Sequence, residues 1–186
     1  NSIARAHTKT AKFSKYITFK KIPYFIKNIL IENKKYIISY LGNEVSYEDA
    51  VAWRLFHVDK EYEGYDIFSN VWHQDAHDGN RLIKIFILID KVEESDGPFH
   101  WIEEKQTKKN WDDLYERWSF ESFKGPKIYS EQRKLIGNKG DYLILDTSRC
   151  MHRDSNPNNV RNIVQITLYP KWRRNKFRNL LNLKAL

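Results

Sequence analysis

Three of the six histidines in this 186-residue sequence are followed two positions later by an aspartate. Two imidazoles and one carboxylate can bind one side of Fe(II) and leave its other coordination positions open for substrate and O2. The spacing suits such a site, because residues i and i+2 of an extended chain point to the same side. The pattern therefore predicts a metal site built from one pair and a later histidine. The three triplets are His57-Val58-Asp59, His73-Gln74-Asp75 and His152-Arg153-Asp154.

The position of each triplet along the chain indicates which residues form the site. His152 is the last histidine, so it cannot begin a pair that a later histidine completes, and we expect it to be the distal ligand. His73 and Asp75 are the favoured pair, because their polar stretch runs into the most apolar strand-like segment, residues 82–89. The predicted metal ligands are His73, Asp75 and His152.

Two other pairs are alternatives for the same role. His57 and Asp59 follow a helical pattern and precede a run of charged residues, which is typical of a solvated helix end. His77 and Asp78 would be a shifted pair, but adjacent residues on a strand face opposite ways. Both pairs are less favourable than His73 and Asp75.

Arg161 lies nine positions after His152, on the same face of an alternating segment as Gln165 and Thr167. A guanidinium group binds a carboxylate through two parallel hydrogen bonds, so Arg161 is suited to hold a dicarboxylate cosubstrate whose other end chelates the metal. The alternative is a surface ion pair near the end of a strand.

Lys84 is a weaker candidate. It interrupts the apolar segment 82–89 and either reaches into a cavity toward an acidic ligand or extends to solvent. The second behaviour is the more typical one for a lysine, so Lys84 is left out of the predicted site.

Short apolar segments bounded by turn residues indicate the elements that position these side chains. Strands following helices, with one helix inserted, predict a mainly β fold with flanking helices (α+β), arranged as a double-layered sheet or a barrel. Helices are expected within residues 13–42, from Ser46 through Leu55, and at 110–123 between the second and third strands. The predicted strands are residues 82–89, 98–102, 142–145 and 162–169.

Charge is distributed unevenly along the chain. The formal net charge is +8, but residues 1–28 carry seven basic groups and no acidic group, and residues 171–186 carry six and none. The remaining 19 basic and 24 acidic residues give the body a net charge of −5. We therefore expect basic ends on an acidic body, and a nucleic-acid partner is disfavoured.

Other features of the composition exclude several classes of protein. The single cysteine excludes a disulfide framework or a multi-cysteine zinc site. No apolar run approaches the roughly 20 residues that cross a bilayer, and no apolar leader is present at the N-terminus. The expectation is a cytoplasmic protein without a membrane span.

Taken together, these motifs resemble the phytanoyl-CoA dioxygenase family in order and spacing over about residues 65–170. The resemblance implies a double-stranded β-helix (jelly-roll, cupin-like) fold, with Fe(II), 2-oxoglutarate and O2 as cofactor and cosubstrates. It also implies that His73, Asp75 and His152 bind iron and that Arg161 binds the far carboxylate of 2-oxoglutarate. The matching motifs are Trp72-His73-Gln74-Asp75, residues 82–90, Asp96-Gly97-Pro98-Phe99, residues 140–147, His152 and Arg161.

This resemblance divides the expected single domain, 1–186, into three parts. Residues 1–64 are predicted to be a mostly helical support, residues 65–170 the jelly-roll catalytic core, and residues 171–186 a basic C-terminal tail. The loop after Pro98 departs from the family, because it reads Ile-Glu-Glu-Lys-Gln at residues 102–106 instead of Pro-Gly-Ser-His.

The expected function is a dioxygenase that hydroxylates an unactivated C–H of a small molecule, biosynthetic intermediate or carrier-bound group and releases succinate and CO2. Related halogenases replace the ligand carboxylate with a small residue, so Asp75 favours oxygenation. One alternative is an oxygenase acting on nucleic acid, with Trp172 among basic residues as a stacking platform. Another is a jelly-roll binding module without catalysis, which retention of all three ligands and Arg161 disfavours.

Overall fold

The structure is a computed structural model and describes residues 11–62, 70, 72–75, 81–109, 130–173 and 178–186. The helix predicted at 110–123 lies outside these residues, as do His77 and Asp78. Among the described residues, no helix combines the length and the apolar character needed to span a membrane.

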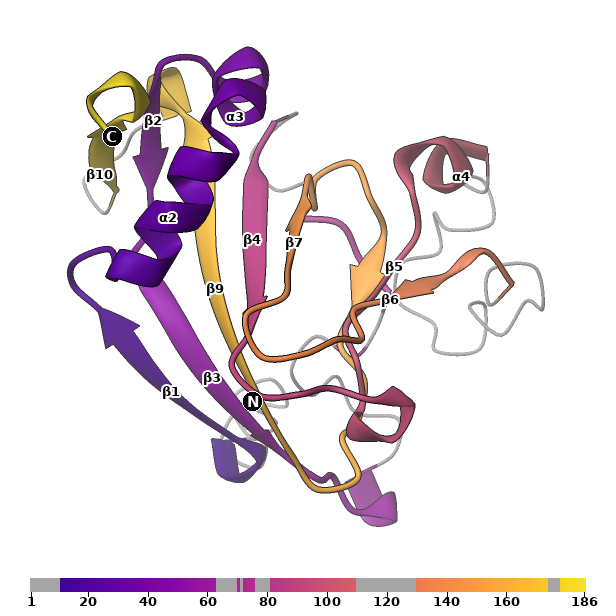
Figure 1. Cartoon of the computed structure of the whole chain (residues 1–186). Helices are drawn as coiled ribbons and strands as arrows, with labels where there is room; N and C mark the ends of the chain where they lie inside the picture. The colour runs from indigo at the N-terminus through magenta and orange to yellow at the C-terminus, as the bar shows by residue number, and fades with distance from the viewer. Residues whose placement is uncertain (1–10, 63–69, 71, 76–80, 110–129, 174–177) are drawn as a thin grey trace, which may run out of the picture.

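Seven antiparallel strands form the larger sheet, with the long strand β9 at its centre (Figure 1). β3 and β2 pair with successive parts of one edge of β9, and β4 pairs with the other edge. β1 lies beyond β3, β10 beyond β2, and β7 beyond β4. The strands are β1 (Ser14–Phe19), β2 (Glu44–Tyr47), β3 (Ala50–Phe56), β4 (Ile83–Leu88), β7 (Tyr142–Leu145), β9 (Val160–Pro170) and β10 (Asn179–Asn182).

A smaller antiparallel sheet contains β6 (Arg133–Lys134), β5 (His100–Trp101) and β8 (His152–Arg153), in that order. Apolar side chains fill the space between the two sheets, including Phe86 from β4, Phe99 before β5 and Ile163 from β9. Two antiparallel sheets packed face to face are the arrangement expected of a double-stranded β-helix.

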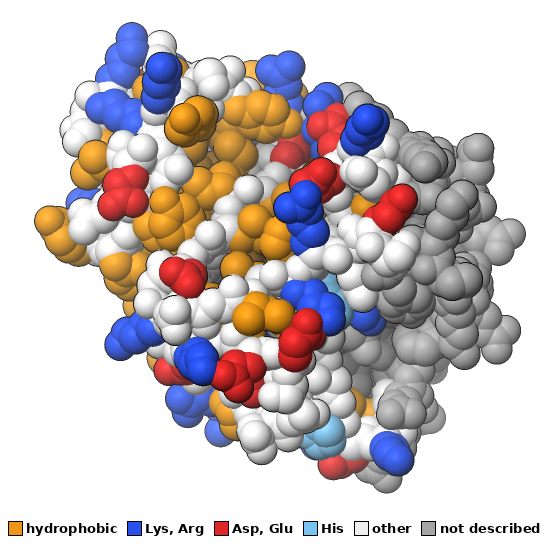
Figure 2. All heavy atoms as spheres, turned by 45° about the vertical axis from the view of Figure 1, so that its right-hand side comes forward, with side chains coloured by type: hydrophobic (Ala, Val, Ile, Leu, Met, Phe, Trp, Pro, Cys, Tyr) orange, Lys and Arg blue, Asp and Glu red, His pale blue; other side chains and the backbone are white. Residues whose placement is uncertain are grey.

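Charges of both signs are mixed on the side of the molecule that carries the smaller sheet. Figure 2 turns this side forward, and blue and red side chains lie next to one another on it. In β6, Arg133 Nη2 lies 2.7 Å from Glu103 Oε1, and Lys134 Nζ lies 2.6 Å from Glu94 Oε2. Both basic residues of β6 are thus paired with acidic residues of the body.

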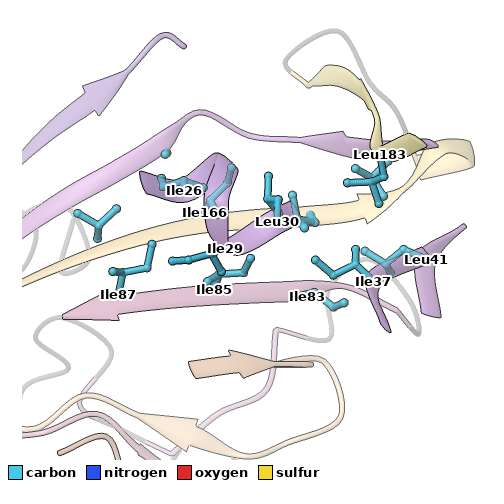
Figure 3. Close-up of a cluster of buried hydrophobic side chains, with 14 residues drawn as sticks. Ile26, Ile29, Leu30, Ile37, Leu41, Ile83, Ile85, Ile87, Ile166 and Leu183 are labelled. Atoms are coloured by element: carbon cyan, nitrogen blue, oxygen red, sulfur yellow. The ribbon is translucent and has the colours of Figure 1, made fainter. Parts of the chain in front are cut away.

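Two helices, α2 (Tyr24–Glu32) and α3 (Lys34–Leu41), cover the outer face of the larger sheet (Figure 1). In α2, Ile26, Ile29 and Leu30 recur at helical spacing and are buried. Figure 3 shows these side chains meeting those of β4 and β9. In the part of the chain that the structure describes, the remaining helices are α4 (Glu104–Lys109) and the 3-10 turns η1 (Ala11–Phe13), η2 (Lys60–Tyr62), η4 (Glu94–Asp96), η6 (Lys171–Arg173) and η7 (Leu183–Ala185).

The two faces of β9 have different environments, because successive side chains of a strand alternate. Val164 and Ile166 face outward and pack in the cluster under α2 and α3. Ile163 and Gln165 face inward and border a cavity. β9 therefore packs against the helices with one face and borders the cavity with the other.

The sequence predicted a mostly helical support over residues 1–64, but its described part, residues 11–62, contains strands as well as helices. α2 and α3 confirm helices within 13–42, but β1, β2 and β3 come from the same region. The helix expected from Ser46 through Leu55 is wrong: Ser46 is a buried residue of β2, and Leu55 lies in β3. Both strands pair with β9, and this pairing overrides the local capping signal.

The described C-terminal residues, 171–173 and 178–186, do not form a free basic tail. β10 pairs with β2, and Leu183 is fully buried in the cluster under the helices. Arg178 Nη2 lies 3.2 Å from Glu48 Oε1, and Lys171 Nζ lies 2.6 Å from Glu44 Oε2. Opposite charge on the body therefore binds this segment to the sheet.

Leu30→Ala is expected to lower the free energy of unfolding by about 3 kcal/mol, because it leaves a cavity under α2 where Leu30 is 0% exposed. The neighbouring Ile31, which is 47% exposed, provides the control, and Ile31→Ala should cost less than about 1 kcal/mol. Chemical denaturation of both variants measures the difference, and equal losses would contradict the packing described.

Candidate metal centre

Two backbone hydrogen bonds join His73 to His152. The N–H of His73 donates to the carbonyl of His152 at 3.0 Å, and the N–H of His152 donates to the carbonyl of His73 at 2.9 Å. The residues are therefore direct cross-strand partners, with ring centroids 4.2 Å apart. Two positions further on, the N–H of Asp75 donates to the carbonyl of Thr147 at 2.9 Å. These bonds fix the backbone beneath three side chains.

The side chains of His73, Asp75 and His152 converge. His73 Nε2 lies 4.0 Å from Asp75 Oδ1, and His152 Nε2 lies 3.5 Å from Asp75 Oδ2. One ligand atom from each residue lies within 4.8 Å of the other two. Within the described part of the chain, no other group of three histidine, cysteine or acidic side chains meets this condition.

A hydrogen bond orients the His152 imidazole. Its Nδ1 lies 3.0 Å from the carbonyl oxygen of Cys150, and since a carbonyl only accepts, Nδ1 carries the proton. Nε2 therefore presents its lone pair toward Asp75. Burial lowers the pKa of His152, and the nearby His73 lowers it further. The neutral imidazole thus favoured is the form that binds a metal ion.

Asp75 is ionised in the site because it has a cationic partner. Lys84 Nζ lies 2.7 Å from Asp75 Oδ2. Burial alone would raise the pKa of the Asp75 carboxyl, but attraction by the Lys84 ammonium lowers it below its usual range. A carboxylate that stays charged at low pH is a competent metal ligand.

Lys84 lies in the site, although the sequence analysis considered it and left it out. The expectation that it extends to solvent is wrong, since its side chain is 19% exposed and borders the cavity. Its position could have indicated this, because Lys84 alternates with Phe86 and Leu88, which pack between the sheets.

A cavity of about 160 Å³ opens beside the three converging residues. Polar groups on its wall come from Ser14, Lys84, Asp154 and Gln165, and apolar surface comes from aromatic and aliphatic side chains. Such a mixture suits a small ligand that combines charged and apolar parts. The bordering residues are Ser14, Trp53, Leu55, His73, Lys84, Phe86, Phe99, His152, Asp154, Ile163 and Gln165.

Arg161 lies on the inward face of β9 but is not among the residues that border the cavity. Its side chain is 1% exposed, and its guanidinium donates to the Asp154 carboxylate and to the Gly97 carbonyl. Asp154 borders the cavity. The aspartate of the third H-x-D triplet is therefore a partner of Arg161.

The His57 pair lies apart from this centre. His57 Nδ1 lies 2.8 Å from the carbonyl oxygen of Pro157, and neither His57 nor Asp59 joins the converging group. The predicted helix end is also wrong, because His57 directly follows strand β3.

Comparison with known proteins identifies the fold. No protein-family model matches the chain, and no curated protein matches its sequence. The iron-bound structure of HygX from Streptomyces hygroscopicus is similar, with a TM-score of 0.53 and 14% identity over 92% of this chain and 77% of HygX. This likeness confirms the predicted mainly β fold with a double-stranded β-helix core.

Two enzymes of nogalamycin biosynthesis have similar structures, each at 10% identity with a TM-score of 0.51. The non-haem α-ketoglutarate-dependent epimerase SnoN matches 91% of this chain and 72% of its own length. The non-haem α-ketoglutarate-dependent carbocyclase SnoK matches 91% of this chain and 74% of its own. Their different reactions indicate that this fold does not determine the chemistry.

Asp154→Ala is expected to lower the free energy of unfolding by about 2 kcal/mol, because it leaves the buried Arg161 guanidinium without its carboxylate. The loss is below that of a fully buried pair, since the Asp154 side chain is 23% exposed. Glu103→Ala breaks the exposed pair with Arg133 and should cost less than about 1 kcal/mol. Urea denaturation compares the two, and an Asp154→Ala loss no larger than the control would contradict this role.

Proposed function

We propose that this protein is a non-haem Fe(II)- and 2-oxoglutarate-dependent oxygenase with His73, Asp75 and His152 as iron ligands. One observation carries the proposal: three ligand atoms from distant parts of the chain lie within 4.8 Å of one another beside a cavity. Similarity in fold to HygX, SnoN and SnoK supports it.

The residues fit a ferrous ion in number and chemical type. Two imidazoles and one carboxylate on one side of the ion leave other positions open for a chelating cosubstrate and O2. Asp75 is ionised and His152 presents Nε2, so neither must lose a proton to bind. The Asp75 carboxylate that would bind the ion already binds a cation, the Lys84 ammonium.

Hydroxylation is the reaction that we propose for this site. Iron, 2-oxoglutarate and O2 together would supply the oxidation of an unactivated C–H bond, with succinate and CO2 as coproducts. The chain's own contribution is to position the substrate and to exclude water. Phe86, Phe99 and Ile163 give the cavity an apolar wall, while Ser14 and Gln165 offer hydrogen bonds that orient polar groups.

Arg161 is the residue that we propose for the far carboxylate of 2-oxoglutarate. Its guanidinium is held rigidly by Asp154 and the Gly97 carbonyl, and its Nε has no hydrogen-bond partner within the described residues. A carboxylate at this end of the cavity would share the guanidinium with Asp154, which can turn toward the cavity that it borders.

We infer a small or carrier-bound substrate and a cytoplasmic enzyme folded as one domain. The cavity suits a small molecule or the end of a longer group, and the buried free thiol of Cys150 suits a reducing compartment. Assignment to the phytanoyl-CoA dioxygenase family stays a prediction from the motifs.

Action on nucleic acid is the less favoured alternative. Lys171 and Arg178, which would contact phosphates, are paired with Glu44 and Glu48. Trp172 is 76% exposed and remains the feature that suits base stacking. Binding of an oligonucleotide that falls steeply with salt would support this alternative.

His152→Ala is expected to abolish the weak visible absorption band that anaerobic Fe(II) and 2-oxoglutarate produce together in the wild-type protein, because one of the three ligands is lost. His57→Ala is the matched control, since His57 begins an H-x-D triplet but lies outside the metal group. The control should keep the band. An unchanged spectrum in His152→Ala would remove the metal assignment.

Arg161→Met is expected to raise the 2-oxoglutarate concentration needed for half-maximal succinate release by about tenfold or more, because a charge-assisted bidentate contact is lost. Iron binding, measured from the metal content after anaerobic dialysis, should be retained. Unaltered cosubstrate dependence in a folded variant would refute the role of Arg161.

A further inference from the structure

Lys84 is a cation placed directly at the candidate metal site. It lies on the inward face of β4, its side chain is 19% exposed, and its Nζ is 2.7 Å from Asp75 Oδ2. His152 carries its proton on Nδ1 and presents a neutral Nε2 toward the carboxylate, so Lys84 balances the negative charge of Asp75 in the metal-free protein.

A divalent ion at the triad would compete with this ammonium. Both cations use the Asp75 carboxylate, and they repel each other strongly in a partly buried site. The metal has two imidazole ligands in addition, whereas Lys84 has a flexible stem that lets the ammonium move. Metal binding therefore displaces Lys84 from Asp75.

The displaced ammonium needs another acceptor, because a partly buried charge without a partner is costly. Among the described residues that border the cavity, Asp154 is the acidic one, and it is held by Arg161. A ligand carboxylate in the cavity supplies the missing partner. Since Lys84 lies beside Asp75, the carboxylate within its reach is the one nearer the metal ligands.

Resting on the proposed function, we infer that Lys84 is a second cosubstrate-binding residue, which metal binding releases from Asp75 and which then pairs with the metal-proximal carboxylate of 2-oxoglutarate. Arg161 binds the far carboxylate, so each end of the dicarboxylate meets one cation. Binding is ordered, with the metal first. Each of the two ligands strengthens the binding of the other through the same ammonium.

Lys84→Met tests this inference because it changes two affinities in opposite directions. Titration calorimetry with Mn(II) alone should give about tenfold tighter binding, since the competing cation is gone. Titration of the Mn(II)-loaded protein with 2-oxoglutarate should give about tenfold weaker binding. Lys134→Met is the matched control, because Lys134 pairs with Glu94 away from the cavity, and both affinities should be unchanged.

Lys84→Gln, which keeps a polar side chain at this position, provides the same test if Lys84→Met does not fold. Affinities equal to those of the control would overturn the inference, and so would a parallel loss of both, which indicates a structural role. If the wild-type protein binds Mn(II) and 2-oxoglutarate while both Lys84 variants match it, the inference fails and the proposed function stands. If the wild-type protein binds neither Mn(II) nor 2-oxoglutarate, both the inference and the proposed function fail.

Discussion

The pairing of His73 with His152 is the constraint on which the site depends. Two backbone hydrogen bonds join residues 79 positions apart in the chain, and a third links Asp75 to Thr147. Neither segment holds three ligand atoms by itself. The three side chains therefore converge only when these two segments have paired, so this pairing would be a condition for metal binding at the proposed centre.

Two ion pairs lie near the cavity. Lys84 with Asp75 and Arg161 with Asp154 bring opposite charges together near the cavity, where these side chains are at least three-quarters buried and an isolated charge would be costly. The pairs differ in the number of acceptors. Arg161 is also held by the Gly97 carbonyl, whereas Lys84 reaches Asp75 from the wall of the cavity. Among the described residues, two acceptors therefore hold the arginine and one carboxylate holds the lysine.

Local patterns predicted the central strands and the convergence of His73, Asp75 and His152. An i, i+2 spacing and an apolar run are readable within a few residues, which is why β4, β7 and β9 were found. The strands β1, β2, β3 and β10 were missed because their conformation depends on partners far along the chain. The partner of Lys84 was missed for the same reason. No pattern within a few residues of Lys84 indicates that Asp75 Oδ2, from another segment, lies 2.7 Å from its Nζ.

The alternation along β9 separates what keeps the protein folded from what its cavity recognises. Val164 and Ile166 belong to the cluster beneath the helices, while their neighbours Ile163 and Gln165 border the cavity. Exchanges at the half-buried Gln165 can reshape the cavity and leave this packing intact, whereas Ile163 also packs between the two sheets. One strand can thus vary a cavity-lining position without disturbing the core, a form of evolvability that suits a fold found in an epimerase and a carbocyclase alike.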